Sequence, residues 1–185
     1  MDNINIRRAC ADDCKGILRM IKELATYEKL GDDVHLTEQE LRQDGFGDRV
    51  FYQCFVAELK SKETDEASSP QGDSLVGFAM FYFVYDPWTG RSICLEDFYV
   101  MRAHRGQGIG SEILKLVSQV AVESRCSVMT FLVAEWNADS IEFYRRRGAV
   151  NCTASEGWHV YNITRQSLQE IASDQKPWRD VVVQA

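Results

Sequence analysis

Residues 95–111 read LEDFYVMRAHRGQGIGS, and this stretch decides the fold. It begins with the end of an apolar run, 93–100, that is typical of a strand. Three glycines at alternate positions follow and interrupt any regular element. Apolar residues then recur with helical spacing, at Ile113, Leu114, Val117, Val120 and Ala121. The stretch therefore predicts a strand that ends in a glycine-rich turn and leads into a helix.

The junction between this strand and this helix is the first candidate functional feature. The first N–H groups of a helix lack partners within it and lie at the positive end of its dipole, so such a junction can hold a pyrophosphate. Gly106, Gly108 and Gly110 match neither the G-x-G-x-x-G dinucleotide fingerprint nor a P-loop with its lysine. A plain strand-to-helix turn that needs small residues for structural reasons is the alternative interpretation.

Length and composition predict one compact domain. The chain has 185 residues, of which 45% are hydrophobic and 11% aromatic, enough for a single buried core. We assign this domain to residues 1–172 and a polar C-terminal extension to 173–185. The formal net charge is −7, from 28 acidic and 21 basic residues, which repels nucleic acids and acidic membranes and attracts small cations. Nucleic-acid and membrane partners are therefore not expected.

The six cysteines suit a reducing compartment. They are scattered without a C-x-x-C pair, and several lie in apolar runs. The first ten residues, MDNINIRRAC, lack the apolar core of a signal peptide, and no run of 18 apolar residues occurs. The sequence predicts a soluble, cytoplasmic protein, and no metal is expected.

Local patterns outline an α+β fold. Strands are expected at residues 4–8, 51–59, 75–85, 93–100, 128–134 and 159–163. A helix is expected around 17–24, with Asp12 or Asp13 as its N-cap. A second should begin at the Thr37–Glu40 capping box and end at Gly45 and Gly47. Further helices are expected after the glycine-rich turn, at 138–147 and at 167–172. Residues 86–90 (DPWTG) suit a hairpin and 61–73 a loop. The predicted sheet is mixed, mainly antiparallel, and has six to seven strands flanked by helices.

Two ordered motifs resemble those of the GNAT acetyltransferase superfamily. Residues 105–110 (RGQGIG) resemble its R/Q-x-x-G-x-G/A coenzyme A loop, and 137–149 (NADSIEFYRRRGA) resembles its later N-x-x-[AS]-x-x-[FL]-Y segment. Further segments, such as 85–88 (YDPW) and 134–137 (AEWN), resemble the spermidine/spermine (diamine) N-acetyltransferases, over nearly the whole chain. The resemblance implies direct transfer of the acetyl group of acetyl-coenzyme A to a polyamine amino group in a ternary complex. It also implies a homodimer.

The resemblance implies where acetyl-coenzyme A binds. Two central strands splay apart in this superfamily, and the pantetheine lies in the gap, paired to backbone. The implied contacts are Phe98, Tyr99 and Val100 for the pantetheine, Arg105, Gly106, Gln107, Gly108, Ile109, Gly110 and Ser111 for the pyrophosphate loop, and Asn137, Ala138, Asp139 and Ser140 for the cofactor arm.

Two residues are candidates for catalysis. By resemblance, Tyr144 is the general acid that protonates the leaving thiolate; an ordinary packing tyrosine is the alternative. An alkylamine is almost wholly protonated at neutral pH, so a base must help, and Glu96 is our candidate, with a structural ion pair as the alternative. Cys94 would share a face with Glu96 only in a strand without a bulge, so we expect direct transfer rather than a covalent acetyl-enzyme on Cys94.

Acidic and aromatic residues flank the cofactor motif, a mixture that suits ammonium groups separated by methylenes. The implied acceptor residues are Tyr27, Glu28, Glu96, Thr130, Phe131, Leu132 and Glu156, with Asp86, Trp88, Asp97 and Trp158 as additions. Glu135 and Trp136 are better read as a solvated carboxylate and a core ring. The vertebrate polyamine enzymes that the sequence resembles have histidine at the position of Thr130. Thialysine or another small amino acid is therefore an alternative acceptor. A coenzyme A-binding regulatory module without turnover and a protein-lysine acetyltransferase are the other hypotheses.

Overall fold

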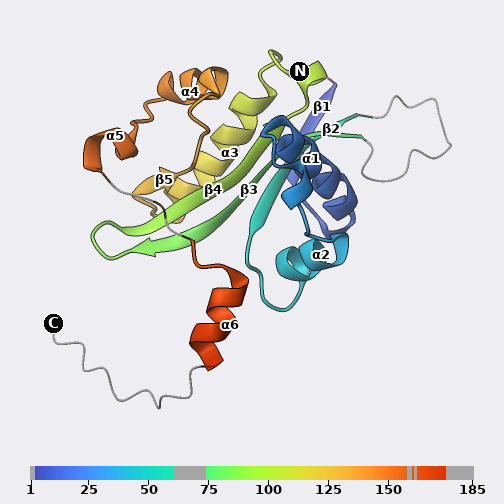
Figure 1. Ribbon diagram of the computed structural model, residues 1–185. Helices are drawn as coiled ribbons and strands as arrows, with labels where there is room; N and C mark the ends of the chain where they lie inside the picture. Colours follow the sequence, from blue (N-terminus) through green and yellow to red (C-terminus); the bar gives the residue numbers. More distant parts are fainter. Residues whose placement is uncertain (1–2, 61–73, 158–159, 161, 174–185) are drawn as a thin grey trace. The chain divides into compact units, whose positions relative to one another are not determined.

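The computed structural model describes residues 3–60, 74–157, 160 and 162–173. The chain folds into two compact units, Met1–Trp136 and Asn137–Ala185. In the first unit, five strands form one sheet in sequential order, namely β1 (Ile4–Arg8), β2 (Gln53–Leu59), β3 (Leu75–Asp86), β4 (Gly90–Val100) and β5 (Val128–Thr130) (Figure 1). Neighbours from β1 to β4 are antiparallel, and β5 lies parallel to β4.

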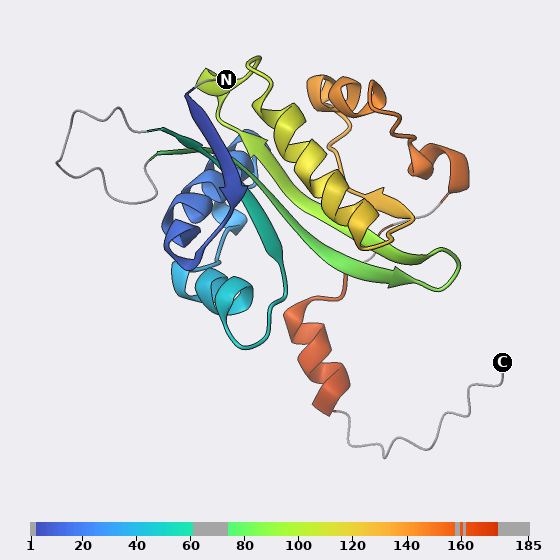
Figure 2. The same ribbon diagram turned by 180° about the vertical axis from the view of Figure 1, so that it is seen from behind.

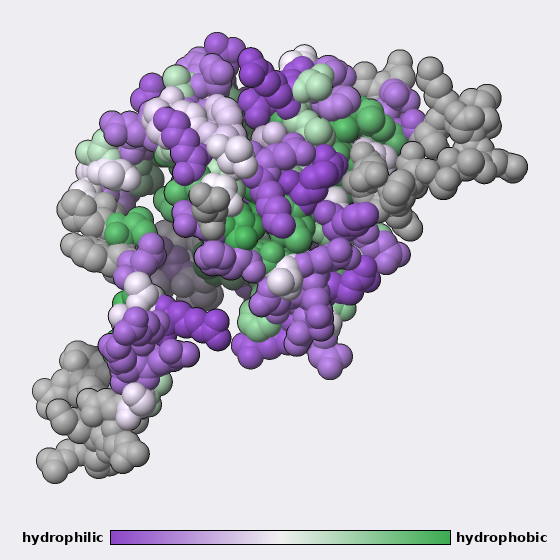
Figure 3. All heavy atoms as spheres, turned by 45° about the vertical axis from the view of Figure 1, so that its right-hand side comes forward, coloured by the Kyte–Doolittle hydropathy of each residue, from purple (hydrophilic) through white to green (hydrophobic). Residues whose placement is uncertain are grey.

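Helices cover both faces of this sheet. Figure 1 shows α1 (Cys14–Tyr27) and α2 (Glu38–Phe46) on one face, and the view from behind in Figure 2 shows α3 (Ile109–Glu123) on the other. The helix α3 makes the crossover between the parallel strands β4 and β5, which such a connection requires. Hydrophilic side chains cover most of the surface seen in Figure 3.

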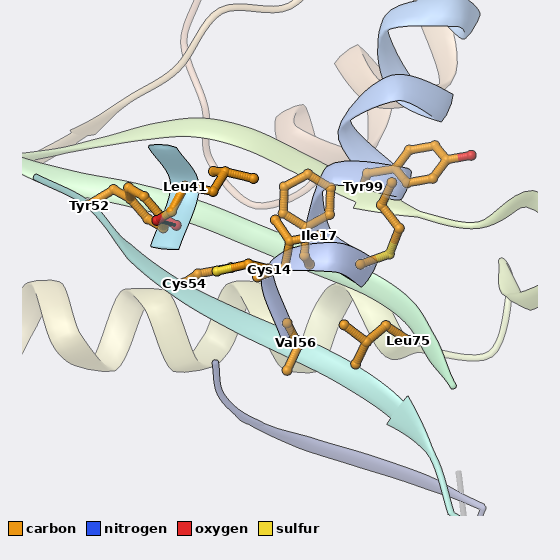
Figure 4. Packing of buried hydrophobic residues seen from close by; sticks show 10 residues of the cluster. Cys14, Ile17, Leu41, Tyr52, Cys54, Val56, Leu75 and Tyr99 are labelled. Carbon is orange, nitrogen blue, oxygen red and sulfur yellow. Dashed lines mark hydrogen bonds between the residues drawn. The ribbon is translucent and has the colours of Figure 1, made fainter. Parts of the chain in front are cut away.

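The core between α1, α2 and the sheet is held by alternate residues of three strands. Cys54 and Val56 of β2 point toward α1, where Ile17 and Met20 are fully buried (Figure 4). The remaining members of this cluster are Cys14, Leu41, Tyr52, Leu75, Phe78 and Tyr99. On the opposite face, α3 buries its own apolar stripe: Ile109, Ile113, Leu114, Val117, Val120 and Ala121. The sheet therefore has a buried hydrophobic layer on each side.

The helix boundaries follow the predicted caps, with two exceptions, Gly45 and Asp13. Thr37 Oγ1 accepts from the amide of Glu40 at 3.2 Å, and the Glu40 carboxylate accepts from the amide of Thr37 at 2.9 Å, so the capping box is confirmed. Gly47 ends α2 as predicted, whereas Gly45 lies inside it. Asp13 occupies the N-cap position of α1, but its side chain caps no amide of that helix, because Arg7 and the amide of Cys10 already donate to it.

The described sheet has five strands, so the prediction of six to seven was wrong. A strand exists only where a neighbour shares its ladder of hydrogen bonds. The last predicted strand, 159–163, has His159 and Tyr161 outside the described residues, and Ile163 is in no strand. β5 spans three residues where a strand of seven, 128–134, was expected, and its first residue Val128 is 48% exposed. The predicted loop 61–73 also lies outside the described residues.

The described residues of the second unit form three short helices, namely α4 (Ala138–Arg145), α5 (Cys152–Glu156) and α6 (Arg165–Ser173). Gly148 follows α4 with a φ of 90°, the left-handed conformation that was expected of a glycine after a helix. The helix α5 was not predicted, although Asn151 caps it by accepting from the amide of Ala154 at 3.2 Å.

All six cysteines are free thiols, with Cys14 and Cys54 buried. Across the described residues, no helix is both long and apolar enough to cross a membrane.

Candidate active site

The outer edge of β4 has a strand partner along only part of its length among the described residues. β5 pairs with β4 only through Ser92, Ile93 and Cys94, and among the described residues no strand pairs with that edge from 95 to 100. An unpaired edge presents a row of N–H and C=O groups that can bind an extended ligand. The edge thus fits the strand-like pantetheine contact expected at Phe98, Tyr99 and Val100.

The turn after β4 has the backbone of an anion site. Gly106 and Gly108 have φ of 76° and 85°, which L-residues other than glycine rarely adopt, and Gly108 is the N-cap of α3. A Cβ added at Gly106 would meet nothing within 4 Å, so the space beside this backbone is open. Among the described residues, no backbone carbonyl accepts from the amides of 106–110. These amides and the open space would suit a pyrophosphate, and its binding here stays a prediction.

Arg105 ties this turn to the end of β4. Its Nε donates to the carbonyl oxygen of Val100 at 2.8 Å, and its guanidinium lies 5.5 Å from the ring centroid of Tyr27 and 5.6 Å from that of Tyr99. Cation–π contact and the hydrogen bond hold the side chain in place. Arg105 therefore orients the turn. Its hydrogen bond also occupies one of the two lone pairs of the Val100 carbonyl oxygen at the strand edge.

A β-bulge in β4 arranges the acidic residues. Met80 of β3 pairs with Asp97 and the next residue, Phe81, pairs with Leu95, so Glu96 is an extra residue on β4. Regular alternation would place Asp97 on the same face as the buried Leu95. The bulge instead places Asp97 on the same face as Cys94, since their partners Met80 and Tyr82 are two residues apart. Two adjacent carboxylates therefore belong to one face of the sheet.

Glu96 is held by two neighbouring donors. The hydroxyl of Tyr82 donates to Glu96 Oε2 at 2.9 Å, and the thiol of Cys94 donates to the same oxygen at 3.7 Å. Cys94 and Glu96 thus lie on one face although the strand is bulged. Our prediction that they could share a face only in a strand without a bulge was wrong. Burial and the nearby Glu96 raise the pKa of Cys94 and keep it a thiol, which is a poor nucleophile.

Asp97 is the most perturbed carboxyl of this site. Burial, followed by the charges of Glu96 and Glu28, raises its pKa to about 6. Glu28 is the C-cap residue of α1, whereas Glu96 and Asp97 belong to β4. The charge part of the shift in the pKa of Asp97 therefore comes from repulsion among three carboxylates. A cation placed among them would relieve this repulsion. The sequence ranked Asp97 as an additional acceptor residue, and only the bulge shows how closely it is coupled to Glu96.

We expect Asp97→Asn to stabilise the folded protein at pH 8. Since the folded-state pKa of Asp97 is raised, its ionisation costs stability as the pH rises from about 4 through 6, and an amide removes that cost. Thermal unfolding at pH 8 and pH 4.5 should show a higher Tm for the variant at pH 8 and a smaller difference at pH 4.5. Equal melting temperatures at pH 8 would contradict the perturbed environment of Asp97.

The other predicted acceptor residues of the first unit are more scattered. Asp86 accepts from the amides of Trp88 and Thr89 at 2.7 and 3.0 Å, which shapes the hairpin turn. This turn is separated from Glu96 by six residues of strand, roughly 20 Å. Trp88 is 82% exposed at the turn. Thr130 ends β5 opposite Cys94, and Phe131 and Leu132 follow it.

Trp136 is not a core residue, contrary to our interpretation of the sequence. It is 52% exposed, and its ring packs on Tyr27 with centroids 5.3 Å apart. Because Tyr27 also contacts Arg105, an aromatic and cationic group forms at the end of α1. No local sequence signal links these three residues, which are distant in the chain.

The second unit holds the remaining candidates. Asn137 caps α4, where its Oδ1 accepts from the amide of Ser140 at 3.3 Å, and Ala138 and Asp139 form the first turn. Tyr144 lies near the end of α4 with its ring 5.2 Å from that of Phe143, and burial raises its pKa so that it stays a neutral phenol. Glu156 ends α5, and Trp158 lies outside the described residues. Within the described part of the chain, no group of three or more His, Cys, Asp or Glu residues could hold a metal ion.

Comparison with known proteins gives the class of this protein, an N-acetyltransferase. The model of the acetyltransferase (GNAT) family matches residues 21–149, so the chain belongs to this family, whose members use acetyl-coenzyme A. The match spans both compact units. The chain is therefore an enzyme of the acetyltransferase type.

Individual relatives refine this picture. The chain is 45% identical to the thialysine N-epsilon-acetyltransferase of Sus scrofa over 172 residues, which cover 93% of this chain and 99% of that one. It is 46% identical to the spermidine/spermine N(1)-acetyltransferase-like protein 1 of Homo sapiens over 93% of this chain, which spans only 24% of that longer protein. Among solved structures, an integron cassette protein of V. cholerae has the same fold, with a TM-score of 0.68 and 20% identity over 92% of this chain and 98% of that one.

Proposed function

We propose that this protein transfers the acetyl group of acetyl-coenzyme A to a primary amino group of spermidine or spermine. The observation that carries the proposal is a cluster of three carboxylates, those of Glu28, Glu96 and Asp97. Burial, and then the charges of Glu96 and Glu28, raise the pKa of Asp97, and a ligand that brings positive charge would relieve the part due to charge. The aromatic rings of Tyr27 and Trp136 beside the end of α1 offer apolar cover for methylenes.

The proposed chemistry begins with the acceptor. At pH 7 an amine near the lysine reference value must lose a proton at a cost of about 3.4 pK units, roughly 4.6 kcal/mol. Glu96, held on one oxygen by Tyr82, takes this proton directly or through a water, and the neutral nitrogen attacks the thioester carbon. The thioester supplies the acetyl group and a thiolate leaving group. Tyr144, which burial keeps protonated, acts as the general acid by donating a hydrogen bond to the sulfur as the C–S bond breaks. The nitrogen loses its second proton as the amide forms, and this proton balances the one that the departing thiolate takes up.

The turn of 106–111 and the edge of β4 bind the cofactor in this proposal. The amides before α3 receive the pyrophosphate, and Asn137 to Ser140 contact the cofactor arm. We further propose that residues 1–172 act as one transferase domain in the cytoplasm and that the enzyme works as a homodimer. The family match across residues 21–149 supports the single domain, since it includes both Glu96 and Tyr144. Light scattering that gives the mass of one chain would contradict the dimer.

Thialysine is the second candidate acceptor. It is favoured by the name of the full-length porcine relative and by Thr130, which departs from the histidine of the polyamine enzymes that the sequence resembles. Thialysine carries its own carboxylate, which three protein carboxylates would repel. This repulsion is why we place polyamines first.

A panel of acceptors tests the proposal. Thiol release from acetyl-coenzyme A should be measured with spermidine, spermine, putrescine, thialysine and lysine at equal concentrations. We expect kcat/KM to be highest for spermidine or spermine, because each presents several ammonium groups to the three carboxylates. A higher value for thialysine would replace the polyamine proposal by the second candidate. Tight binding of acetyl-coenzyme A without turnover on any amine would favour a regulatory module.

A further inference from the structure

Tyr82 reaches the candidate base from the neighbouring strand. It pairs with Cys94 across the ladder between β3 and β4, two residues before Glu96. Its hydroxyl donates to Glu96 Oε2 at 2.9 Å. The thiol of Cys94 contacts the same oxygen at 3.7 Å, and Glu96 Oε1 accepts no hydrogen bond from any described residue. One carboxylate oxygen is therefore engaged while the other faces no protein donor there.

We propose that Tyr82 is a positioning residue that fixes the Glu96 carboxylate, so that Oε1 receives the proton of the acceptor amine. The inference rests on the proposed function of Glu96. In this inference Tyr82 acts through Glu96, to which its hydroxyl donates a hydrogen bond. The step moves one proton from the ammonium group to Oε1, while the proton of Tyr82 stays on its oxygen.

The bulge explains why Glu96 needs a residue that fixes its carboxylate. Glu96 is the extra residue of β4, so it has no partner in the ladder of β3, and its side chain is exposed to solvent. An exposed carboxylate on a flexible side chain samples several rotamers. A charge-assisted hydrogen bond from a half-buried ring on the adjacent strand restricts it to one. A base must lie within hydrogen-bond reach of the proton that it takes, so this restriction raises the fraction of productive complexes.

The phenol is suited to this role by its own protonation. Hydrogen bonding with Cys94 and Glu96 raises the pKa of Tyr82, so it remains a donor throughout the working range of pH. Phenylalanine keeps the ring and loses only the donor. Tyr85, three residues further along β3 and 78% exposed, offers a matched control for the loss of a hydroxyl.

A double-mutant cycle tests the inference on the full chain. Tyr82→Phe, Glu96→Gln and the double variant should be compared with Tyr85→Phe, using spermidine and acetyl-coenzyme A and checking each melting temperature. We expect Tyr82→Phe to lower kcat about 10-fold with little change in either KM, because one charge-assisted hydrogen bond is lost. In the Glu96→Gln background the same change should cost less than about 2-fold, since no base is left to position. Tyr85→Phe should match the wild type.

Two results would overturn the inference while leaving the function intact. One is a kcat for Tyr82→Phe within twofold of the wild type. The other is a loss of equal size with and without Glu96, which would make Tyr82 a structural residue. If the wild type acetylates no amine at all, the proposed function fails and this inference fails with it.

Discussion

We expect Tyr144→Phe to lower kcat by about 100-fold or more, within the range of about 10²- to 10⁴-fold for a lost general acid. The thiolate of coenzyme A departs with developing negative charge, and a thiol has a reference pKa of about 8.5. Burial raises the pKa of Tyr144 above its ordinary value, so complete proton transfer to the sulfur is uphill. The phenol therefore acts by donating a strong hydrogen bond as the charge develops, which phenylalanine cannot do.

Thiol release under saturating conditions measures this effect, and calorimetry should show unchanged affinity for acetyl-coenzyme A. Because Tyr144 is half-buried, Phe fills the same space and the melting temperature should change little. Tyr85→Phe again serves as the control. Equal turnover of Tyr144→Phe and the wild type would remove Tyr144 from the mechanism and leave it a packing residue of α4.

The second large effect concerns stability. Asp13 is 1% exposed and accepts from both Nη atoms of Arg7 at 2.6 and 2.9 Å, and from the amide of Cys10 at 2.7 Å. Removing the partner of a buried charge costs about 3 to 5 kcal/mol, so Arg7→Met should lower the free energy of unfolding by that amount at pH 7. In Arg42→Met, loss of the contact between Arg42 and Asp12, whose side chains are 44% and 61% exposed, should cost at most about 1 kcal/mol.

The dependence on pH separates this explanation from a loss of packing. Burial alone would favour the neutral acid, but the hydrogen bonds from Arg7 and Cys10 outweigh it and lower the pKa of Asp13. The stabilisation is therefore complete above the unfolded value of about 3.9 and is lost as the pH falls through the lower folded value. Urea unfolding should show a difference between wild type and Arg7→Met that is largest at pH 7 and shrinks below about pH 4. A difference independent of pH would indicate packing alone.

Local signals predicted the parts of the fold that depend on neighbouring residues. The Thr37–Glu40 capping box, the turn at 86–90 and the glycine-rich turn between β4 and α3 each arise from a few adjacent residues, and all were confirmed. The length of β5 depends on how far β4 and β5 stay together before they separate, which no local pattern records. The same holds for Asp13, a good N-cap by type that forms a buried ion pair with a strand residue instead.

The candidate site was less predictable than the fold, and the bulge at Glu96 is the reason. Its register shift depends on pairing with Met80 and Phe81, and it changes which face Asp97 occupies. A simple alternation of residues therefore gives the wrong neighbours for Asp97. The contacts of Arg105 with Tyr27 and Tyr99 likewise join three elements that are far apart in the sequence.

Calorimetric titration with coenzyme A, compared with pantetheine, tests the central claim most directly. The claim is that the amides of 106–111 bind the pyrophosphate, a group that pantetheine lacks. We predict one binding site per chain for coenzyme A and an affinity for pantetheine weaker by about tenfold or more, since charge-assisted hydrogen bonds to the phosphates are lost. No heat of association with coenzyme A, or equal affinity for both ligands, would contradict the claim.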